Sequence, residues 1–266
     1  MSQVAAIAAR FPQIRKALLF GKNDALVPIT RMEYVCPEYE EYNIVLRFPR
    51  LCGFSLKLPV RKRVACFFCT NYPHQTYAAW LDFIPERCER WGKFQIANGG
   101  DCIRSAVACN PSSVYGKCDA SFVGYVFQKD ENEDDPSANI KMVDAIGYGH
   151  LNFILLINLA KDKADDDDND DEDNFLHDTP PVHILAHVTE AKGVEGDGSK
   201  EILTFTQFGW SFILNITSIT HIAGRVFTRG VRPAGEWAII DRTQGLEKTN
   251  FQVEEHGSSD EEGWDN

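Results

Sequence analysis

The sequence has no long apolar run. No stretch reaches the roughly 18 consecutive apolar residues that a membrane-spanning helix requires, so we expect no membrane contact. Residues 1–20 place their basic residues after a short apolar stretch, which is not the order found in a signal peptide. The Gly-x-Ser-x-Gly motif of serine hydrolases and the phosphate-binding P-loop are also missing. We therefore expect an intracellular protein without either of these two catalytic signatures.

Cysteine is absent from the second half of the chain, and all eight cysteines lie between Cys36 and Cys118. In a reducing compartment they are expected to remain thiols. Cys66 and Cys69 have the C-x-x-C spacing of a zinc knuckle. However, residues 63–72 read as a strand, on which positions three apart face opposite sides. We expect buried core thiols here, with zinc binding as the alternative.

Basic residues are fewer than acidic ones, and the net charge of −12 is spread unevenly. Carboxylates are concentrated at 129–135, at 162–174 and at 254–266. Such runs repel themselves and contain few apolar residues, which predicts a disordered acidic insertion at 162–174 and a disordered acidic tail at 246–266. The rest of the chain is close to neutral. The charge of the whole chain therefore does not exclude an anionic partner.

Long helical patterns are also scarce after residue 90, where short strand-like runs follow one another with Gly, Asp, Asn or Pro between them. The runs are 93–97, 102–108, 120–128, 150–160, 182–191, 201–208, 211–219, 221–228 and 236–242. Successive strands without intervening helices favour an antiparallel sheet that closes on itself. The sequence predicts a mainly β fold, with a partly closed antiparallel β-barrel over 91–245. Residues 1–90 are expected to form a small mixed α/β segment packed on the barrel.

Two groups of polar residues were candidates for chemistry. Asp101, Asp144 and Asp241 would bind a divalent cation for metal-assisted hydrolysis if their carboxylates converged. The spacing alone does not indicate that they converge, so no metal and no cofactor are expected. His183 and His187 are four apart on a predicted strand among apolar neighbours, which favours structural histidines over a catalytic pair.

Several blocks of the second half recur in a recognisable order. They are 91–106 with its Gly-Gly-Asp, 118–127, 145–159, 183–192, 216–227 and 235–242. This order resembles the segment that follows the catalytic region in transposases of basidiomycete fungi, of the Kyakuja-Dileera-Zisupton type and relatives. The layout also resembles bromo-adjacent homology modules, which are small β-barrels that bind chromatin proteins. The resemblance implies a solitary accessory domain, and no catalytic residue carries over.

The resemblance implies a non-catalytic, transposon-derived interaction module with a protein or chromatin partner in the nucleus; the cytoplasm is the alternative location. Residues 57–63 form a short basic cluster that could act as a nuclear-import signal. Four aromatic residues are candidates for a binding groove: Trp91, Tyr125, Tyr148 and Trp237. A nucleic-acid-binding accessory domain is the second alternative. Its candidate contacts are Arg87, Arg90, Lys93, Arg104, Arg225, Arg229 and Arg232.

Overall fold

The computed structural model describes residues 32–97, 100–109, 120–132, 137–160, 179–197, 202–230 and 235–241. The predicted acidic insertion, the acidic tail and Arg232 lie outside these residues. The first half contains β1 (Glu33–Val35), β2 (Ile44–Ser55), α3 (Leu58–Asn71), α4 (Tyr77–Phe83), β3 (Arg87–Ile96), β4 (Cys102–Arg104) and β5 (Phe122–Asp130). The second half contains β6 (Met142–Asn158), β7 (Val182–Lys192), β8 (Glu195–Asp197), β9 (Ile202–Phe205), β10 (Gln207–Asn215), β11 (Ile219–Ile222), β12 (Gly224–Arg229) and β13 (Glu236–Ile240).

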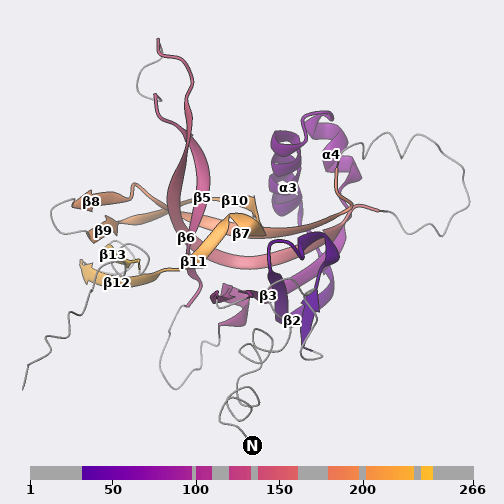
Figure 1. The fold of residues 1–266 in the computed structure, drawn as a ribbon, viewed down its shortest axis with the longest axis horizontal. Helices are drawn as coiled ribbons and strands as arrows, with labels where there is room; N and C mark the ends of the chain where they lie inside the picture. Colours follow the sequence, from indigo (N-terminus) through magenta and orange to yellow (C-terminus); the bar gives the residue numbers. More distant parts are fainter. Residues whose placement is uncertain are drawn as a thin grey trace, which may run out of the picture.

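The described chain is mainly β, which confirms the predicted class. Nine antiparallel strands form the main sheet in the order β1-β2-β3-β6-β5-β11, with β4 beside β3, β7 beside β6 and β10 beside β7. The sheet curves into an open half-barrel (Figure 1). It is not the more closed barrel that the sequence suggested, because β11 pairs with β5 only over Val123–Tyr125 and β10 pairs with β7 alone among the described strands.

Strand β6 organises this sheet because it is long and apolar on both faces. One edge of β6 pairs with β7 over Gly149–Asn158. The other edge pairs first with β5, over Met142–His150, and then with β3, over Ile154–Leu156. Ile154 lies in the core inside the curve of the sheet, whereas Leu155 lies in a second core on its outer face. The expectation that 150–160 is a central strand is therefore confirmed.

The outer face of the sheet is covered by α3 and α4 (Figure 1). The prediction of a strand over 63–72 is wrong, because residues 63–71 belong to α3 and Tyr72 is its C-cap. Val60, Val64 and Phe68 follow one another at intervals of four residues and pack against the sheet as one helical face. Pro59 stands in the first turn, where a missing N–H costs little.

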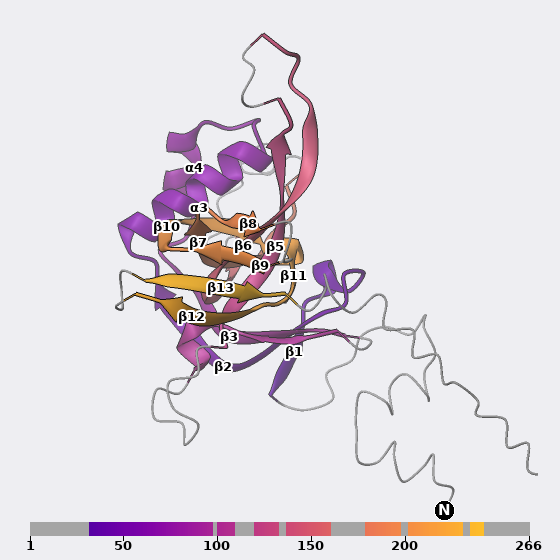
Figure 2. The ribbon, with the colours of Figure 1, turned by 90° about the vertical axis from the view of Figure 1, so that its left-hand side faces the viewer.

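A smaller sheet of four strands, in the order β12-β13-β9-β8, lies beside the half-barrel (Figure 2). A third core joins the two sheets. Phe122 of β5 stacks on Phe205 of β9 with ring centroids 5.6 Å apart, and Tyr148 and Ile239 pack in the same cluster. The guanidinium of Arg225 lies over the rings of Phe122, Phe208 and Trp237. These contacts fix the small sheet at one end of the half-barrel.

The segment before residue 90 contributes more than a helical layer. β2 pairs along the length of β3, and the boundary expected between residues 90 and 91 falls within β3 itself. β3 and β4 form the predicted hairpin, and the Ile96 N–H donates to the Asp101 carbonyl at 3.0 Å across its turn. No helix among the described residues is both long enough and apolar enough to cross a membrane.

Candidate functional site

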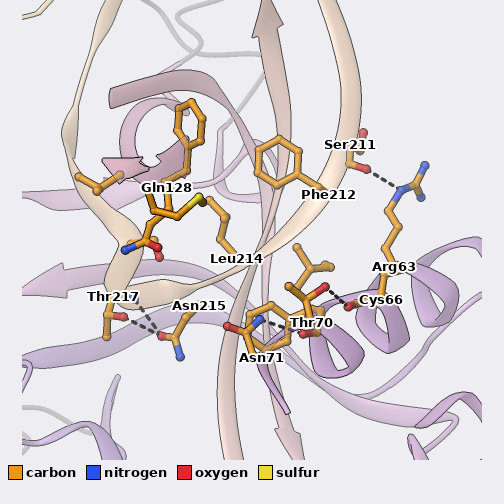
Figure 3. Close-up of a pocket in the computed structure, with 16 residues that line it drawn as sticks. Arg63, Cys66, Thr70, Asn71, Gln128, Ser211, Phe212, Leu214, Asn215 and Thr217 are labelled. Atoms are coloured by element: carbon orange, nitrogen blue, oxygen red, sulfur yellow. Dashed lines mark hydrogen bonds between the residues drawn. The ribbon is translucent and has the colours of Figure 1, made fainter. Parts of the chain in front are cut away.

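A hollow of about 950 Å³ opens between α3, β10 and the end of the β5–β6 hairpin (Figure 3). We call this hollow the notch. The free end of the hairpin projects beyond the body of the molecule (Figure 1) and forms one wall, and α3 forms the other. The notch is lined by Arg63, Cys66, Phe67, Thr70, Asn71, Val126, Phe127, Gln128, Met142, Ser211, Phe212, Ile213, Leu214, Asn215, Thr217 and Ser218.

The β10 side of the notch is the edge of the strand. Five consecutive residues, 211–215, line the hollow, whereas the face of a strand would present alternate residues. The Ser211 carbonyl points away from β7 and accepts a hydrogen bond of 2.8 Å from Arg63 Nε. Because backbone groups alternate in direction along a strand, those of Ile213 point the same way, as does the Asn215 N–H. The Asn215 carbonyl instead begins the 3-10 helix Ile216–Ser218. No described strand pairs with this edge.

The β5 side of the notch also ends in a strand edge. The Phe122 carbonyl accepts from the Ala223 N–H and the Gly124 carbonyl from the Thr220 hydroxyl, so both point away from β6. By the same alternation, the backbone groups of Val126 and Gln128 point away from β6 as well. Pairing with β11 stops at Tyr125, and no other described strand continues it. Two edges that no described strand pairs therefore open into one hollow.

The walls of the notch are mostly apolar. Phe212 and Leu214 come from β10, Phe67 from α3, and Phe127 and Met142 from the hairpin. Phe127 is 38% exposed and Met142 is 52% exposed, so both present apolar surface to the hollow. A hollow of this size with apolar walls and a few polar groups has the features of a binding site.

Among the residues that the structure describes, Arg63 is the only charged one that lines the notch. Its Nε and Nη1 donate to the carbonyls of Ser211 and Pro59 at 2.8 and 3.3 Å. Nη2 has no hydrogen-bond partner within the described part of the chain, so one face of the guanidinium is available to a ligand. His187 lies nearby on β7, and burial, followed by the charge of Arg63, lowers its pKa to about 4. At neutral pH the described lining of the notch therefore carries one positive charge.

The four aromatic residues proposed as a binding groove do not lie together. Trp91 is buried in the inner core, where it stacks on Tyr34 with centroids 5.8 Å apart. Tyr148 and Trp237 belong to the core between the two sheets. Tyr125 is 5% exposed and comes nearest to the notch, because the centroid of its ring lies 5.5 Å from that of Phe212.

The three carboxylates proposed as a hydrolase site occupy separate structural positions. Asp101 accepts a hydrogen bond of 3.0 Å from the Ile222 N–H at its Oδ2 atom. Asp144 is exposed on the β5–β6 hairpin, and Asp241 is buried beside Tyr148. Within the described residues, no group of three or more His, Cys, Asp or Glu side chains is placed to hold a metal ion. This arrangement contradicts the three-carboxylate metal site that the sequence suggested as an alternative.

Asp241 instead connects the two sheets. Its Oδ2 accepts a hydrogen bond of 2.5 Å from the Tyr148 hydroxyl of β6 and lies 3.2 Å from Nε2 of His221 on β11. Its side chain is only 3% exposed. Burial, followed by the hydrogen bond to Asp241, raises the pKa of Tyr148, so this phenol stays protonated and donates. Asp241 directly follows β13, so these contacts hold the small sheet against the large one.

Gly124→Ala is expected to weaken this junction. A Cβ at Gly124 would lie 2.4 Å from Cε1 and Nε2 of His221, and the buried ring would have to move away from Asp241. We expect a loss of about 1–3 kcal/mol in the free energy of unfolding, measured by urea denaturation. Gly224→Ala is the matched control, since its Cβ would approach no atom closer than 3.3 Å. Equal stability of the two variants would contradict this role for Gly124.

The C-x-x-C pair lies on a helix, which overturns the strand argument against it. Cys66 and Cys69 are one turn apart on α3, and Cys66 is exposed at the notch while Cys69 is half-buried. The expected buried thiols are found at Cys36 and Cys88 but not at Cys66. No zinc-binding cluster forms around this pair within the described residues.

The basic residues proposed for nucleic-acid contact are only partly grouped. Lys93 and Arg104 are directly opposite each other on β3 and β4, and Lys93 is also opposite Arg47 on β2. Arg47 forms an ion pair of 3.0 Å with Glu33. The remaining described candidates lie elsewhere or are engaged: Arg229 pairs with Glu236, Arg225 lies among aromatic rings, and Arg90 lies over Phe54.

The notch residues were missed because their grouping depends on α3 and on which strand edges remain unpaired. A helical signal was present, since Leu58-Pro59 is a favourable helix start and apolar residues follow at intervals of four. The β-branched and aromatic content of residues 63–72 concealed it. No local signal identifies β10 as an edge strand.

No protein-family model matches this chain, and the comparisons with curated proteins and with solved structures found no match either.

Proposed function

We propose that this protein is an interaction module that binds a polypeptide segment of a partner protein in the notch. The observation that carries the proposal is the meeting of two sheet edges that no described strand pairs, at Ile213 of β10 and at Val126 and Gln128 of β5, in one apolar hollow. Unpaired edges offer backbone donors and acceptors that a polypeptide can satisfy along its whole length.

The composition of the notch supports a polypeptide more than a small polar ligand. Its walls supply aromatic and aliphatic contacts from three elements, while its polar groups are mainly amides and hydroxyls. Burial of apolar side chains provides affinity, and a few placed polar groups provide orientation. The transposon-derived origin, the chromatin partner and the nuclear location stay predictions from the sequence, as does the expected absence of catalysis.

A matched pair of variants on α3 tests this function. Thr70 is exposed and lines the notch, whereas Lys62 is exposed on the same helix and does not line it. Thr70→Trp should fill the hollow, and Lys62→Trp should add the same side chain outside it. Partners would be captured from nuclear and cytosolic extracts with the full chain as bait and identified by mass spectrometry.

We expect at least one protein that the wild type and Lys62→Trp capture and that Thr70→Trp loses by tenfold or more. Circular dichroism and urea unfolding would confirm that both variants remain folded. Identical capture by all three chains would overturn the notch as the binding site.

A further inference from the structure

We propose that the partner segment binds as an added β-strand on the edge of β10, with a carboxylate beside Arg63 and alternating apolar side chains in the notch. This inference rests on the proposed function and specifies its mode of binding and the chemistry of its ligand. A strand added at this position would narrow the opening of the half-barrel between β10 and β5.

The backbone of β10 determines where such a strand can pair. Ile213 directs its N–H and its C=O toward the notch, and no described strand occupies those groups. Asn215 contributes only its N–H, because it is the N-cap of the 3-10 helix Ile216–Ser218 and its carbonyl accepts the first bond of that turn. Arg63 already occupies the Ser211 carbonyl, so pairing is interrupted at that residue. The free register is therefore short, and it is centred on Ile213. Specificity must then come from side chains as well as from backbone hydrogen bonds.

We favour the β10 edge over the β5 edge because more of the notch is built around it. Five consecutive residues of β10 line the hollow, compared with three of β5, and α3 stands beside β10 and supplies a second wall. The β5 edge at Val126 and Gln128 belongs to the hairpin that projects beyond the body of the molecule (Figure 1). No described helix stands beside that edge to supply a second wall, as α3 does for β10.

The two faces of an added strand would meet different surroundings. Side chains at positions opposite Phe212 and Leu214 lie on the inner side of the sheet, where Phe127 and Met142 also contribute apolar surface. Side chains opposite Ile213 and Asn215 lie toward α3, where Cys66 and Thr70 leave room for smaller groups. The expected ligand therefore has large apolar residues at alternate positions.

The positive charge of Arg63 determines which charged side chain the ligand should carry. Within the described part of the chain, Arg63 is the single charged lining residue, and its Nη2 has no partner there. The neighbouring His187 is neutral at pH 7 because burial, followed by Arg63, lowers its pKa to about 4. A carboxylate is the side chain that pairs with a partly buried guanidinium through a charge-assisted hydrogen bond. An acidic residue should therefore lie at the Ser211 end of the ligand.

The test begins with selection of a displayed library of random linear peptides on the full wild-type chain. Cys66 lies in the notch and Cys52 is exposed outside it, so the two thiols provide an internal comparison. A bound peptide should slow alkylation of Cys66 at least tenfold and leave Cys52 unchanged, as measured by peptide mass spectrometry. We expect the enriched peptides to share alternating apolar residues and one Asp or Glu.

Backbone N-methylation of the best peptide, one position at a time, then tests the strand. Methyl groups at alternate positions should weaken binding tenfold or more, because they remove N–H groups that pair with β10, while the intervening positions should have little effect. Arg63→Gln should weaken binding of the acidic peptide by about 10–100-fold and should not weaken binding of its Gln-substituted version further. Lys62→Gln is the matched control and should bind normally.

The possible failures are distinguishable. Two outcomes would overturn the added strand on β10 and leave the proposed function standing. In the first, the peptide protects Cys66 but its N-methyl groups show no alternating effect on binding. In the second, Val126→Pro weakens peptide binding and Ile213→Pro does not. Failure of every selected peptide to protect Cys66 would overturn both. Slow alkylation of Cys66 in the free chain would show that this chain itself fills the notch, through another segment or through a second copy detected by light scattering. That result would overturn the partner protein as the occupant.

Discussion

Trp80→Ala is expected to lower the free energy of unfolding by about 3–5 kcal/mol. Trp80 has no exposed surface, and its ring stacks on Phe68 of α3 with centroids 4.9 Å apart. Its indole N–H also donates to the Tyr72 carbonyl at 3.3 Å, just after α3 ends. Removing the indole would leave a cavity between the two helices and the outer face of the sheet. The loss would be measured by urea unfolding followed by tryptophan fluorescence and circular dichroism.

Tyr77→Ala is the control for this experiment, because Tyr77 lies on the same helix and is 37% exposed. This substitution should lower the free energy of unfolding by less than about 1 kcal/mol. A small effect of Trp80→Ala, comparable with that of Tyr77→Ala, would show that α4 contributes little to the stability of the sheet. The wall formed by α3 would then depend on its own contacts with β10.

The second large expected effect is a loss of stability on acidification from pH 6.5 to pH 4. Burial lowers the pKa of His183 and of His187 from 6.5 to about 4 in the folded protein. Between these two pH values the unfolded chain binds more protons than the folded chain, so stability falls as the pH falls. Each pKa unit corresponds to about 1.4 kcal/mol, which gives roughly 3 kcal/mol for each histidine.

His183→Phe separates this effect from the protonation of carboxylates. The His183 ring packs edge-on against Phe68, with ring centroids 4.8 Å apart, and its centroid lies 5.5 Å from that of Tyr72. A phenyl ring therefore suits the same space. Urea unfolding would be measured at intervals between pH 4 and pH 7 for both chains. The variant should lose about half of the histidine contribution to the pH dependence. Parallel pH profiles would show that His183 does not remain neutral in the fold.

How far the sequence predicts this fold can be judged from single elements. Residues 150–160 were recognised as a central strand because Ile154 and Leu155, on opposite faces, are both apolar, and such a run needs cover on both sides. Helix α3 was misread because Cys66, Phe67 and Phe68 have strand-like composition, and packing against the sheet decided the outcome. Local propensity is a weak guide where tertiary contacts are this extensive.

The candidate site was harder to predict than the fold. The sequence suggests aromatic residues as a binding groove, yet Trp91 and Tyr148 are core residues. Their burial depends on strands that are far away in the sequence. Among the described strands, the notch arises because β11 pairs with only part of β5 and β10 pairs with β7 alone. Such incomplete pairing is a property of the whole sheet. It leaves no composition or spacing that could be read along the chain.

The hydrogen bond from Arg63 to the Ser211 carbonyl has a consequence for solubility. An open sheet edge can recruit identical edges from other molecules and begin aggregation, and natural proteins limit this with charges placed on the edge. Arg63 interrupts the β10 edge with a positive charge, so two copies that approached edge to edge would bring like charges together. We expect this guanidinium group on the neighbouring helix to disfavour self-association, while no described strand pairs with the backbone groups of Ile213.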